Sequence, residues 1–354
     1  MSAAAEREHR APLDLRSDTV TKPTSGMRRA MADAEVGDDV LDGDPTTRRL
    51  EAVIAERLGK ESALFFPTGT MANQVAIWLL TTPGTELLVD HDAHIVHSEM
   101  AATAALAGVQ VRLVRSAAPV FRAADLAAAL SPSSPHATEL SLVCLENTHN
   151  GAGGVVTSLL DLRALCDVAS AANLPVHLDG ARLWNASAAS GTSLADFAAC
   201  ADTVMVSCSK ALGAPIGSLL AGPRDIMARA VRVRRRLGGG MRQSGVLAAA
   251  ALYGLEHHLA RVPEDHAAAR YLGDMINGIG GARVVPPDTN ILMIDLPHPK
   301  AEAVVARAAA LGVRVSSWTP SRVRAVTHLN APIAEVAEAA PRLAQALHDV
   351  LSAA

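Results

Sequence analysis

Apolar positions along this chain follow two spacings in turn, and the alternation predicts the order of its elements. Short apolar runs rich in β-branched residues, which are typical of buried strands, cover residues 85–90, 109–115, 141–146, 175–179 and 203–207. Between the third and the fourth of these runs, residues 161–173 have helical spacing. This alternation predicts an α/β fold with a mostly parallel sheet and helices on both faces.

An earlier helix is predicted over residues 45–58. Asp44 is a favourable N-cap residue, Pro45 suits the first turn, and the apolar positions that follow mark one face. The helix therefore has both a start signal and a side to bury.

The order of strand-like and helical stretches differs in the C-terminal third. Three apolar runs and two helical stretches follow one another there, at 290–296, 299–311, 313–318, 322–328 and 332–350. Short strands mixed with helices in this order predict a smaller α+β domain.

The chain is long enough for two domains. A helical stretch over residues 244–262 is expected to join them. We therefore expect an N-terminal arm over residues 1–15, a large domain over 16–255 and a small domain over 256–354.

Composition narrows the class of protein. The 354 residues are 49% hydrophobic with a net charge of −4, which is typical of a soluble globular protein and gives no general attraction for nucleic acid. The basic run at 232–236 is interpreted as a solvated helix face. The charged N-terminus is unlike a secretory signal, and no apolar run is long enough to span a membrane. We expect a cytoplasmic protein without a membrane or nucleic-acid partner.

The four cysteines do not change this picture. Cys144, Cys166, Cys200 and Cys208 lack the CxxC or CxxH spacing of zinc sites, and they do not form a disulfide framework of the kind found in small secreted proteins. A reducing compartment is therefore expected.

Polar residues gather where the predicted strands end. Asp179 ends the fourth strand, Lys210 follows the fifth, Glu146 and His149 lie at the end of the third, and His94 follows the first. Ligands of an open parallel sheet bind outside the carboxyl ends of its strands, so these side chains are expected to converge on one rim.

Lys210 stands out because no other charged residue lies between Thr203 and Arg224. An apolar setting favours the neutral amine, which can attack a carbonyl carbon and form a Schiff base. Pyridoxal phosphate (PLP) couples such a lysine to a carboxylate that pairs with its ring nitrogen, and Asp179 is a candidate for that carboxylate. Taken alone, Lys210 is interpreted as an ordinary lysine at a strand end, and Asp179 is equally well interpreted as a helix N-cap.

Two segments are candidate anion sites. Residues 65–80 predict a short strand, a loop with Gly69 and Thr70, and then a helix whose first N–H groups suit a phosphate. Arg235 and Arg242 flank the triple glycine at 238–240, a second candidate loop.

Together these segments resemble the threonine aldolase family of fold type I PLP enzymes. The matching stretches are "DLRSDTVTKPT" (14–24), "VGDDV" (36–40), "FPTGTMANQ" (66–74), "LENTHNGAGG" (146–154), "HLDGARLWNA" (177–186), "SCSKALGAPIGSLLAG" (207–222), "GGGMRQSGVLAAA" (238–250) and "RAVTH" (324–328). They occur in the family's order from about residue 13 to 350, which makes the resemblance specific. It implies an aspartate-aminotransferase-like large domain and a homodimer or homotetramer with shared sites.

The resemblance also implies roles on the cofactor side. Lys210 would carry the Schiff base, Asp179 would hold the pyridinium nitrogen, and His94 would stack on the ring. Gly69 and Thr70 would bind the phosphate, helped by Arg235 or Arg242 from a neighbouring subunit, while Arg182 would also bear on the phenolic oxygen.

On the substrate side, the resemblance implies that Ser17, Arg182 and Arg324 hold the substrate carboxylate and that His149 lies near its hydroxyl. The implied reaction is cleavage of L-threonine, L-allo-threonine or a related β-hydroxy-α-amino acid to glycine and an aldehyde. His94, His149 or an activated water could be the base. Transaldolation, β-elimination or another lyase reaction with the same cofactor, and a silent amino-acid-binding relative, remain alternatives.

Two stretches depart from the family pattern, and both are expected on the substrate side. Leu41 stands where relatives commonly have tyrosine, and residues 96–98 (Val, His, Ser) replace bulkier groups. His91, His94 and His97 have a spacing that could suggest a metal, but no further ligand completes the set, so none is expected.

Overall fold

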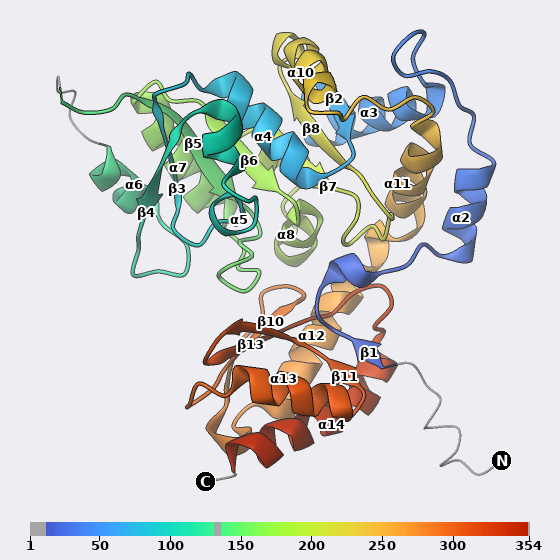
Figure 1. Cartoon of the computed structure of the whole chain (residues 1–354), viewed down its shortest axis with the longest axis vertical. Coiled ribbons are helices and arrows are strands. Elements are labelled where there is room, and N and C mark those ends of the chain that lie inside the picture. Colours follow the sequence, from blue (N-terminus) through green and yellow to red (C-terminus); the bar gives the residue numbers. More distant parts are fainter. Residues whose placement is uncertain (1–11, 131–135, 353–354) are drawn as a thin grey trace. The chain divides into compact units, whose positions relative to one another are not determined.

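The computed structural model describes residues 12–130 and 136–352 (Figure 1). The described residues form two compact units, one over Lys22–Ala260 and one that combines residues 12–21 with residues 261–352. The sequence-based bounds placed residues 16–21 and 256–260 differently. The early segment joins the C-terminal unit because β1 (Leu13–Asp14) pairs in parallel with β11 (Val313–Arg314) and Leu15 is buried in that unit's core.

The large unit is built on a seven-stranded sheet in the order β2-β8-β7-β6-β5-β3-β4. The strands are β2 (Ser62–Phe66), β3 (Glu86–Asp90), β4 (Gln110–Val114), β5 (Leu140–Glu146), β6 (Val176–Gly180), β7 (Thr203–Ser207) and β8 (Ser218–Gly222). β8 is antiparallel to both of its neighbours, and the other pairs are parallel. The predicted mostly parallel α/β sheet is confirmed.

The strand β8 was missed by the sequence analysis. Only residues 208–217 separate it from β7. A parallel connection needs a crossover of a dozen or more residues, so a link this short forces the chain to return antiparallel. The short link therefore also places Lys210 in a tight turn at the carboxyl end of β7.

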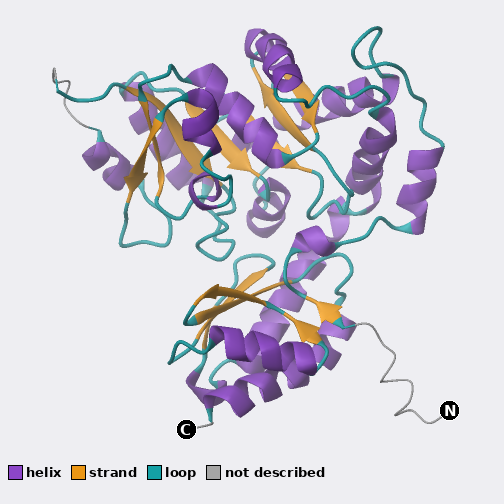
Figure 2. Ribbon diagram, in the orientation of Figure 1, coloured by secondary structure: helices purple, strands orange, loops and turns teal. Residues whose placement is uncertain are grey.

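Helices flank the strands of this sheet (Figure 2). They are α2 (Ser25–Ala32), α3 (Pro45–Leu58), α4 (Gly69–Leu80), α5 (His94–His97), α6 (Ala123–Ala129), α7 (Leu159–Ala171), α8 (Leu183–Ser190), α9 (Leu194–Ala198), α10 (Arg224–Arg236) and α11 (Gly245–His257), with a π-helical turn at Thr103–Ala107. Asp44 caps α3 as predicted, since its Oδ1 accepts the Thr47 N–H at 2.8 Å. Apolar side chains of α4 and α10 pack in one cluster with those of β2, β7 and β8, so that face of the sheet is buried.

The C-terminal unit is the predicted α+β domain, with a four-stranded antiparallel sheet in the order β12-β13-β10-β9. Its elements are β9 (Arg283–Val285), β10 (Ile291–Asp295), β12 (Ser316–Thr319), β13 (Arg322–Val326), α12 (Val262–Ile276), α13 (Ala301–Ala310), α14 (Ile333–Leu351) and the 3-10 turn Asp18–Val20. The predicted strand at 313–318 is split into β11 and β12, and β9 was not predicted.

The predicted continuous helix at 244–262 is also broken. It ends as α11, and α12 begins at Val262 with Pro263 in its first turn. A proline has no N–H to donate and its ring clashes with the carbonyl one turn earlier, so a helix cannot run through this point without strain. None of the described helices is long and apolar enough to cross a membrane.

Glu51 is a partly buried acid on α3 that forms a hydrogen bond with β2. Glu51 Oε1 accepts the Phe65 N–H at 2.8 Å, and Arg234 donates to the Phe65 carbonyl at 2.6 Å and to Asp39 at 2.8 Å. Burial raises the pKa of Glu51 to about 7, against the opposing effects of the Phe65 hydrogen bond and the Arg234 charge. Glu51 is therefore expected to titrate in the folded protein near neutral pH.

This predicts a pH-dependent effect of Glu51→Gln. Because the folded pKa lies above the unfolded one, the folded state binds the extra proton between about pH 4.5 and 7, so the Glu51 contribution to stability is present at low pH and lost as the pH rises through 7. We expect Glu51→Gln to raise the free energy of unfolding at pH 8 by about 1–3 kcal/mol and to change it little at pH 5. Urea unfolding at both pH values measures this, with the exposed Glu56→Gln on the same helix as control. Equal effects of Glu51→Gln at the two pH values would contradict the expectation.

Candidate active site

Chemistry-bearing residues meet at the carboxyl ends of the parallel strands, as the sequence predicted. Glu146 at the end of β5 is aligned with Asp179 on β6. Ser207 ends β7 and is aligned with Ser218 on β8, which is aligned in turn with Phe66 at the end of β2. The start of α4, which follows β2, therefore lies at the same edge as the end of β7.

Asp179 is the carboxylate at the centre of this edge. It is 4% exposed, and its Oδ1 accepts the Ala181 N–H at 3.0 Å. Its Oδ2 accepts a hydrogen bond from Asn73 Nδ2 at 2.8 Å, and the same amide donates to Glu99 Oε1 at 2.9 Å. Asn73 therefore holds two buried carboxylates side by side.

His177 fixes the orientation of the Asn73 amide by a hydrogen bond to its oxygen. His177 Nε2 lies 3.1 Å from Asn73 Oδ1, and its Nδ1 lies 2.9 Å from Thr203 Oγ1. Burial lowers the pKa of His177 to about 4, so the ring is neutral at physiological pH. A neutral ring that donates from Nε2 to Asn73 and accepts at Nδ1 from Thr203 satisfies every group, and it turns the Asn73 NH2 towards the carboxylates.

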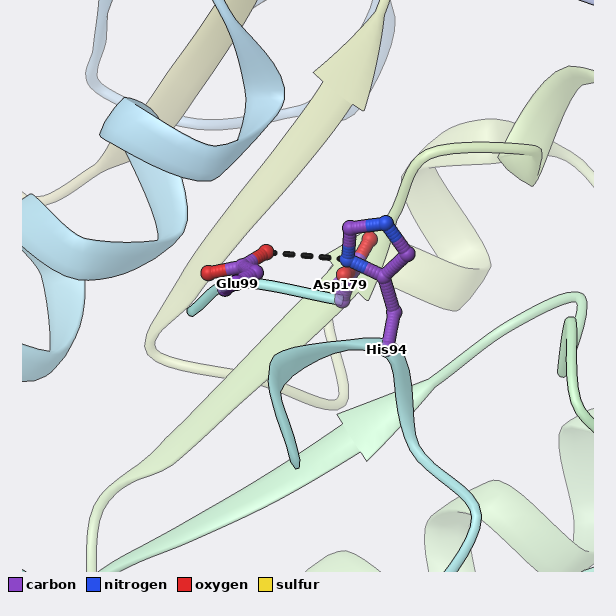
Figure 3. Close-up of side chains that lie close together, drawn as sticks. All are labelled: His94, Glu99 and Asp179. Atoms are coloured by element: carbon purple, nitrogen blue, oxygen red, sulfur yellow. Dashed lines mark hydrogen bonds and ion pairs between the residues drawn. The ribbon is translucent and has the colours of Figure 1, made fainter. Parts of the chain in front are cut away.

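His94 covers the same place from α5 (Figure 3). Its Nδ1 lies 3.0 Å from Glu99 Oε1, and Glu99 is itself fully buried. Burial alone would lower the pKa of His94, but the hydrogen bond to Glu99 and the charge of Asp179 outweigh it and raise the pKa. Because Nδ1 faces Glu99, Nε2 is the nitrogen through which His94 can exchange a proton with a bound molecule.

The histidine trio considered for a metal is not what the structure brings together. His97 donates from Nε2 to the carbonyl oxygen of His91 at 2.7 Å, away from His94. In the described part of the chain, ligand atoms of His94, Glu99 and Asp179 lie within 4.8 Å of one another. The amide of Asn73 already donates to both carboxylates of that group, which suits an arrangement that holds them as hydrogen-bond acceptors.

Glu146 ties two loops of the site together. Its Oε2 accepts the His94 N–H at 2.8 Å, and its Oε1 accepts the Asn150 N–H at 2.8 Å. The Asn150 side-chain oxygen accepts from Arg182 Nη1 at 3.1 Å. Arg182, 4% exposed, is thus directed from the start of α8 by the loop that follows β5.

His149 is completely buried and both of its ring nitrogens face protein groups. Nδ1 accepts the Ala152 N–H at 3.1 Å, and Nε2 lies 3.4 Å from Asp90 Oδ1. Burial disfavours the charged ring, but the charges of Glu146 and Asp90 outweigh it and raise the pKa of His149. This arrangement disfavours His149 as the base, and its predicted contact with the substrate hydroxyl stays a prediction.

Lys210 lies in the turn between β7 and β8, with its side chain partly buried. The turn is fixed by hydrogen bonds from Cys208 N to Gly217 O (2.9 Å) and from Gly213 N to Lys210 O (2.9 Å). Gly217 has a φ of +116°, and a Cβ there would lie 2.6 Å from the Phe65 ring, so only glycine fits. The neighbouring strand β6 carries Asp179, which puts the amine and the carboxylate on adjacent strands at one edge.

The predicted phosphate loop is instead the start of a helix. Gly69 and Thr70 are the first two residues of α4, and Thr68 is its N-cap, accepting the Met71 N–H at 3.2 Å. The N–H groups of Gly69 and Thr70 thus belong to the open first turn, where an anion is favoured.

Arg235 and Arg242 are held by the loop before α3 in this single chain. Arg235 donates to the Val40 carbonyl at 3.2 Å, and the exposed Arg242 pairs with Asp38 at 3.2 Å. Their predicted role at a neighbouring subunit's phosphate stays a prediction.

Two predicted substrate ligands belong to the C-terminal unit. Ser17 caps the 3-10 turn, accepting the Thr19 N–H at 3.2 Å. Arg324 lies on β13, is 8% exposed, and stacks over the Trp318 ring at 5.0 Å. The other predicted site residues lie in the large unit.

Most residues of the stretches that depart from the family pattern are exposed. Leu41 is 74% exposed in the loop before α3, and the His97 side chain is 59% exposed on α5. Val96 packs partly against the core and Ser98 is exposed.

Sequence reasoning missed Asn73 and His177, and it gave Glu146 no role beyond its place at a strand end. Asn73 lies in the quoted stretch "FPTGTMANQ", four residues into α4, and His177 opens "HLDGAR". Alternation along β6 puts His177 on the same face as Asp179, and this was the available signal.

Removal of the Asn73 amide should disturb the site through Asp179. Asn73→Leu leaves Asp179, Glu99 and His177 each short of a hydrogen-bond partner. We therefore expect the free energy of unfolding to fall by about 2–4 kcal/mol. We also expect the kcat/KM of the protein's own reaction to fall by about 10- to 100-fold. The control is Thr103→Val, which removes the Gln74 Nε2 to Thr103 bond (3.3 Å) without touching Asp179. Thermal unfolding and steady-state kinetics of folded protein measure both effects. Activity equal in the two variants would show that Asn73 does not position Asp179.

Known proteins are similar to this chain over most of its length. The beta-eliminating lyase family model matches residues 14–298. The low specificity L-threonine aldolase of Escherichia coli strain K12 is 40% identical over 329 residues, 93% of this chain and 97% of that protein.

Solved structures share the fold. A putative L-allo-threonine aldolase from Listeria monocytogenes superposes with a TM-score of 0.80 at 24% identity, covering 96% of both chains. A serine palmitoyltransferase variant from S. paucimobilis, solved with a bound PLP–myriocin adduct, reaches a TM-score of 0.76 at 17% identity, covering 96% of this chain and 88% of that one. The predicted fold type I architecture is confirmed.

Proposed function

Since the chain belongs to the threonine aldolases of the beta-eliminating lyase family, we propose that it is a PLP-dependent enzyme that cleaves L-threonine, L-allo-threonine or a related β-hydroxy-α-amino acid to glycine and an aldehyde. The observation that carries this proposal is the pairing on adjacent strands of a buried carboxylate with a lysine. Asp179 lies on β6 and Lys210 directly after β7. E. coli threonine aldolase, named for its action on L-threonine, aligns with nearly the whole chain.

The donor set at this edge fits PLP. Asp179, kept in place by Asn73 and the Ala181 N–H, suits a protonated ring nitrogen. Lys210 supplies a primary amine for the aldehyde, and the first turn of α4 suits a phosphate. When bound, PLP supplies a protonated ring that withdraws the electron pair of the bond being broken.

The candidate site residues of the large unit then have separate roles. Lys210 would hold the cofactor's aldehyde through its amine. Asp179 would hold the protonated ring nitrogen, and His94 would cover the ring. We assign the proton of the substrate's β-hydroxyl to His94 Nε2 or to a water next to it, because Glu99 on Nδ1 strengthens this histidine as a base while His149 is completely buried and its Nδ1 accepts the Ala152 N–H.

Several parts of the proposal rest on the family alone. They are the carboxylate contacts of Ser17, Arg182 and Arg324, the phosphate contacts of Arg235 and Arg242 from a second subunit, a homodimer or homotetramer, and a cytoplasmic location. Each of these stays a prediction.

Product analysis tests the proposed function. Purified protein with added PLP is incubated with L-threonine and L-allo-threonine, and glycine, acetaldehyde, 2-oxobutanoate and ammonia are measured. Aldol cleavage predicts glycine and acetaldehyde in equal amounts. Ammonia with 2-oxobutanoate would indicate elimination instead, and no product from either isomer or from other β-hydroxy-α-amino acids would favour a silent relative.

A further inference from the structure

A cavity lies at the amino ends of the parallel strands of the same sheet. It has a volume of about 660 Å³ and is lined by Pro175 and Val176 at the start of β6 and by Asp202 just before β7. Strands β6 and β7 each have five residues, so about 16 Å of strand separates this edge from the carboxyl ends. The cavity is therefore distinct from the candidate active site.

Two cysteine thiols share this cavity. Cys166 lies on α7 and Cys200 follows α9, and both line the cavity and are partly exposed. Helix α7 packs against α9, and the Cys166 and Cys200 side chains lie close enough to influence each other. The Cys200 thiol also donates to the Asp196 carbonyl oxygen at 3.5 Å. The fold thus brings two thiols to one cavity although they lie 34 residues apart in sequence.

Several charged groups lie near the pair. Arg163 and Asp167 come from α7, Asp202 precedes β7, and Lys60 reaches in from the end of α3 to donate to the Ala201 carbonyl at 2.5 Å. Burial raises the pKa of Cys166 to about 12. Burial also raises the pKa of Cys200, but Arg163 and Lys60 oppose that rise, so Cys200 is the more easily ionised thiol.

We propose that Cys166 and Cys200 form a dithiol site that a small disulfide oxidant, of the class of oxidised glutathione, converts to an intramolecular disulfide bond. Two thiols at the wall of one open cavity give such an oxidant access to one sulfur and leave the second sulfur nearby to attack the first. The proposal is independent of the aldolase activity.

The chemistry takes two exchange steps. The Cys200 thiolate attacks one sulfur of the oxidant, forming a mixed disulfide and releasing one thiolate. The Cys166 thiolate then attacks the Cys200 sulfur, the Cys166–Cys200 bond forms, and a second thiolate leaves. Two protein protons are lost, and the two electrons reduce one oxidant molecule to two thiols.

Mass spectrometry of the whole protein tests the site. The wild-type chain is treated with oxidised glutathione at pH 8.5, quenched by acid, and its free thiols are counted after denaturation. We expect the loss of two hydrogens with no added glutathione, two of the four thiols protected, and a cross-link between the peptides that hold Cys166 and Cys200. The rate should rise with pH between 7 and 9, because only thiolates exchange.

Single variants sharpen the test. In Cys166→Ser and in Cys200→Ser the internal bond cannot form, so the remaining thiol should retain one glutathione or stay free. Cys208→Ala is the matched control, because the tryptic peptide 183–210 also contains Cys208, which is fully buried; its oxidation should match the wild type. Four free thiols after oxidation, stable glutathione adducts on the wild type, or a cross-link that needs Cys208 would each overturn the proposal.

Discussion

Lys210→Ala is expected to abolish aldol cleavage, with a fall in kcat/KM of at least about 1000-fold, the scale seen when an enzyme loses its covalent nucleophile. The alanine side chain has no amine to attach the cofactor's aldehyde or to exchange with the substrate's amino group. Steady-state rates of glycine formation from L-threonine measure the loss.

The control for Lys210→Ala is a lysine of the same unit outside the site. Lys60 donates to the Ala201 carbonyl near the amino ends of the strands, so Lys60→Ala should keep activity within a few-fold of the wild type. Equal rates in Lys210→Ala and the wild type would rule out Lys210 as the attachment residue.

Asp179→Asn should have the next largest effect. The amide has nearly the same size but carries no negative charge, so it cannot keep a proton on the ring nitrogen. It also replaces the acceptor of the Asn73 hydrogen bond with a group that can be a donor. We expect kcat/KM to fall by about 100- to 1000-fold, as is typical for the loss of one electrostatic contact to developing charge.

Asp202→Asn provides the matched control for Asp179→Asn. Asp202 Oδ2 accepts the Val176 N–H at 2.7 Å at the amino end of the strands, and an amide oxygen can keep that bond. Activity should therefore be nearly unchanged. A loss in Asp202→Asn as large as that in Asp179→Asn would show that the charge near the ring nitrogen is not the cause.

Local patterns were enough to predict the mostly parallel sheet of the large unit and to place Asp179 and Lys210 at the ends of neighbouring strands. Alternating strand and helix spacing placed β6 and β7, and the rule that ligands bind at carboxyl strand ends then selected Asp179 and Lys210. Capping chemistry likewise predicted the start of α3 at Asp44 and Pro45.

What local patterns missed depends on tertiary contacts. The hydrogen bonds of Asn73 join α4 to β6 and to Glu99, and no spacing along the chain encodes them. The pairing of β1 with β11 places residues 12–21 in the C-terminal unit, because strand partners distant in sequence are fixed by packing. The neighbouring positions of Cys166 and Cys200 arise in the same way.

The most direct test of the account is to locate the cofactor on the chain. The protein is incubated with PLP, reduced with sodium borohydride, digested, and its lysines are mapped by mass spectrometry. The account predicts a pyridoxyl group on Lys210 and a visible absorption band that reduction removes. Stoichiometric labelling of a different lysine, or no label on protein that cleaves L-threonine, would contradict it.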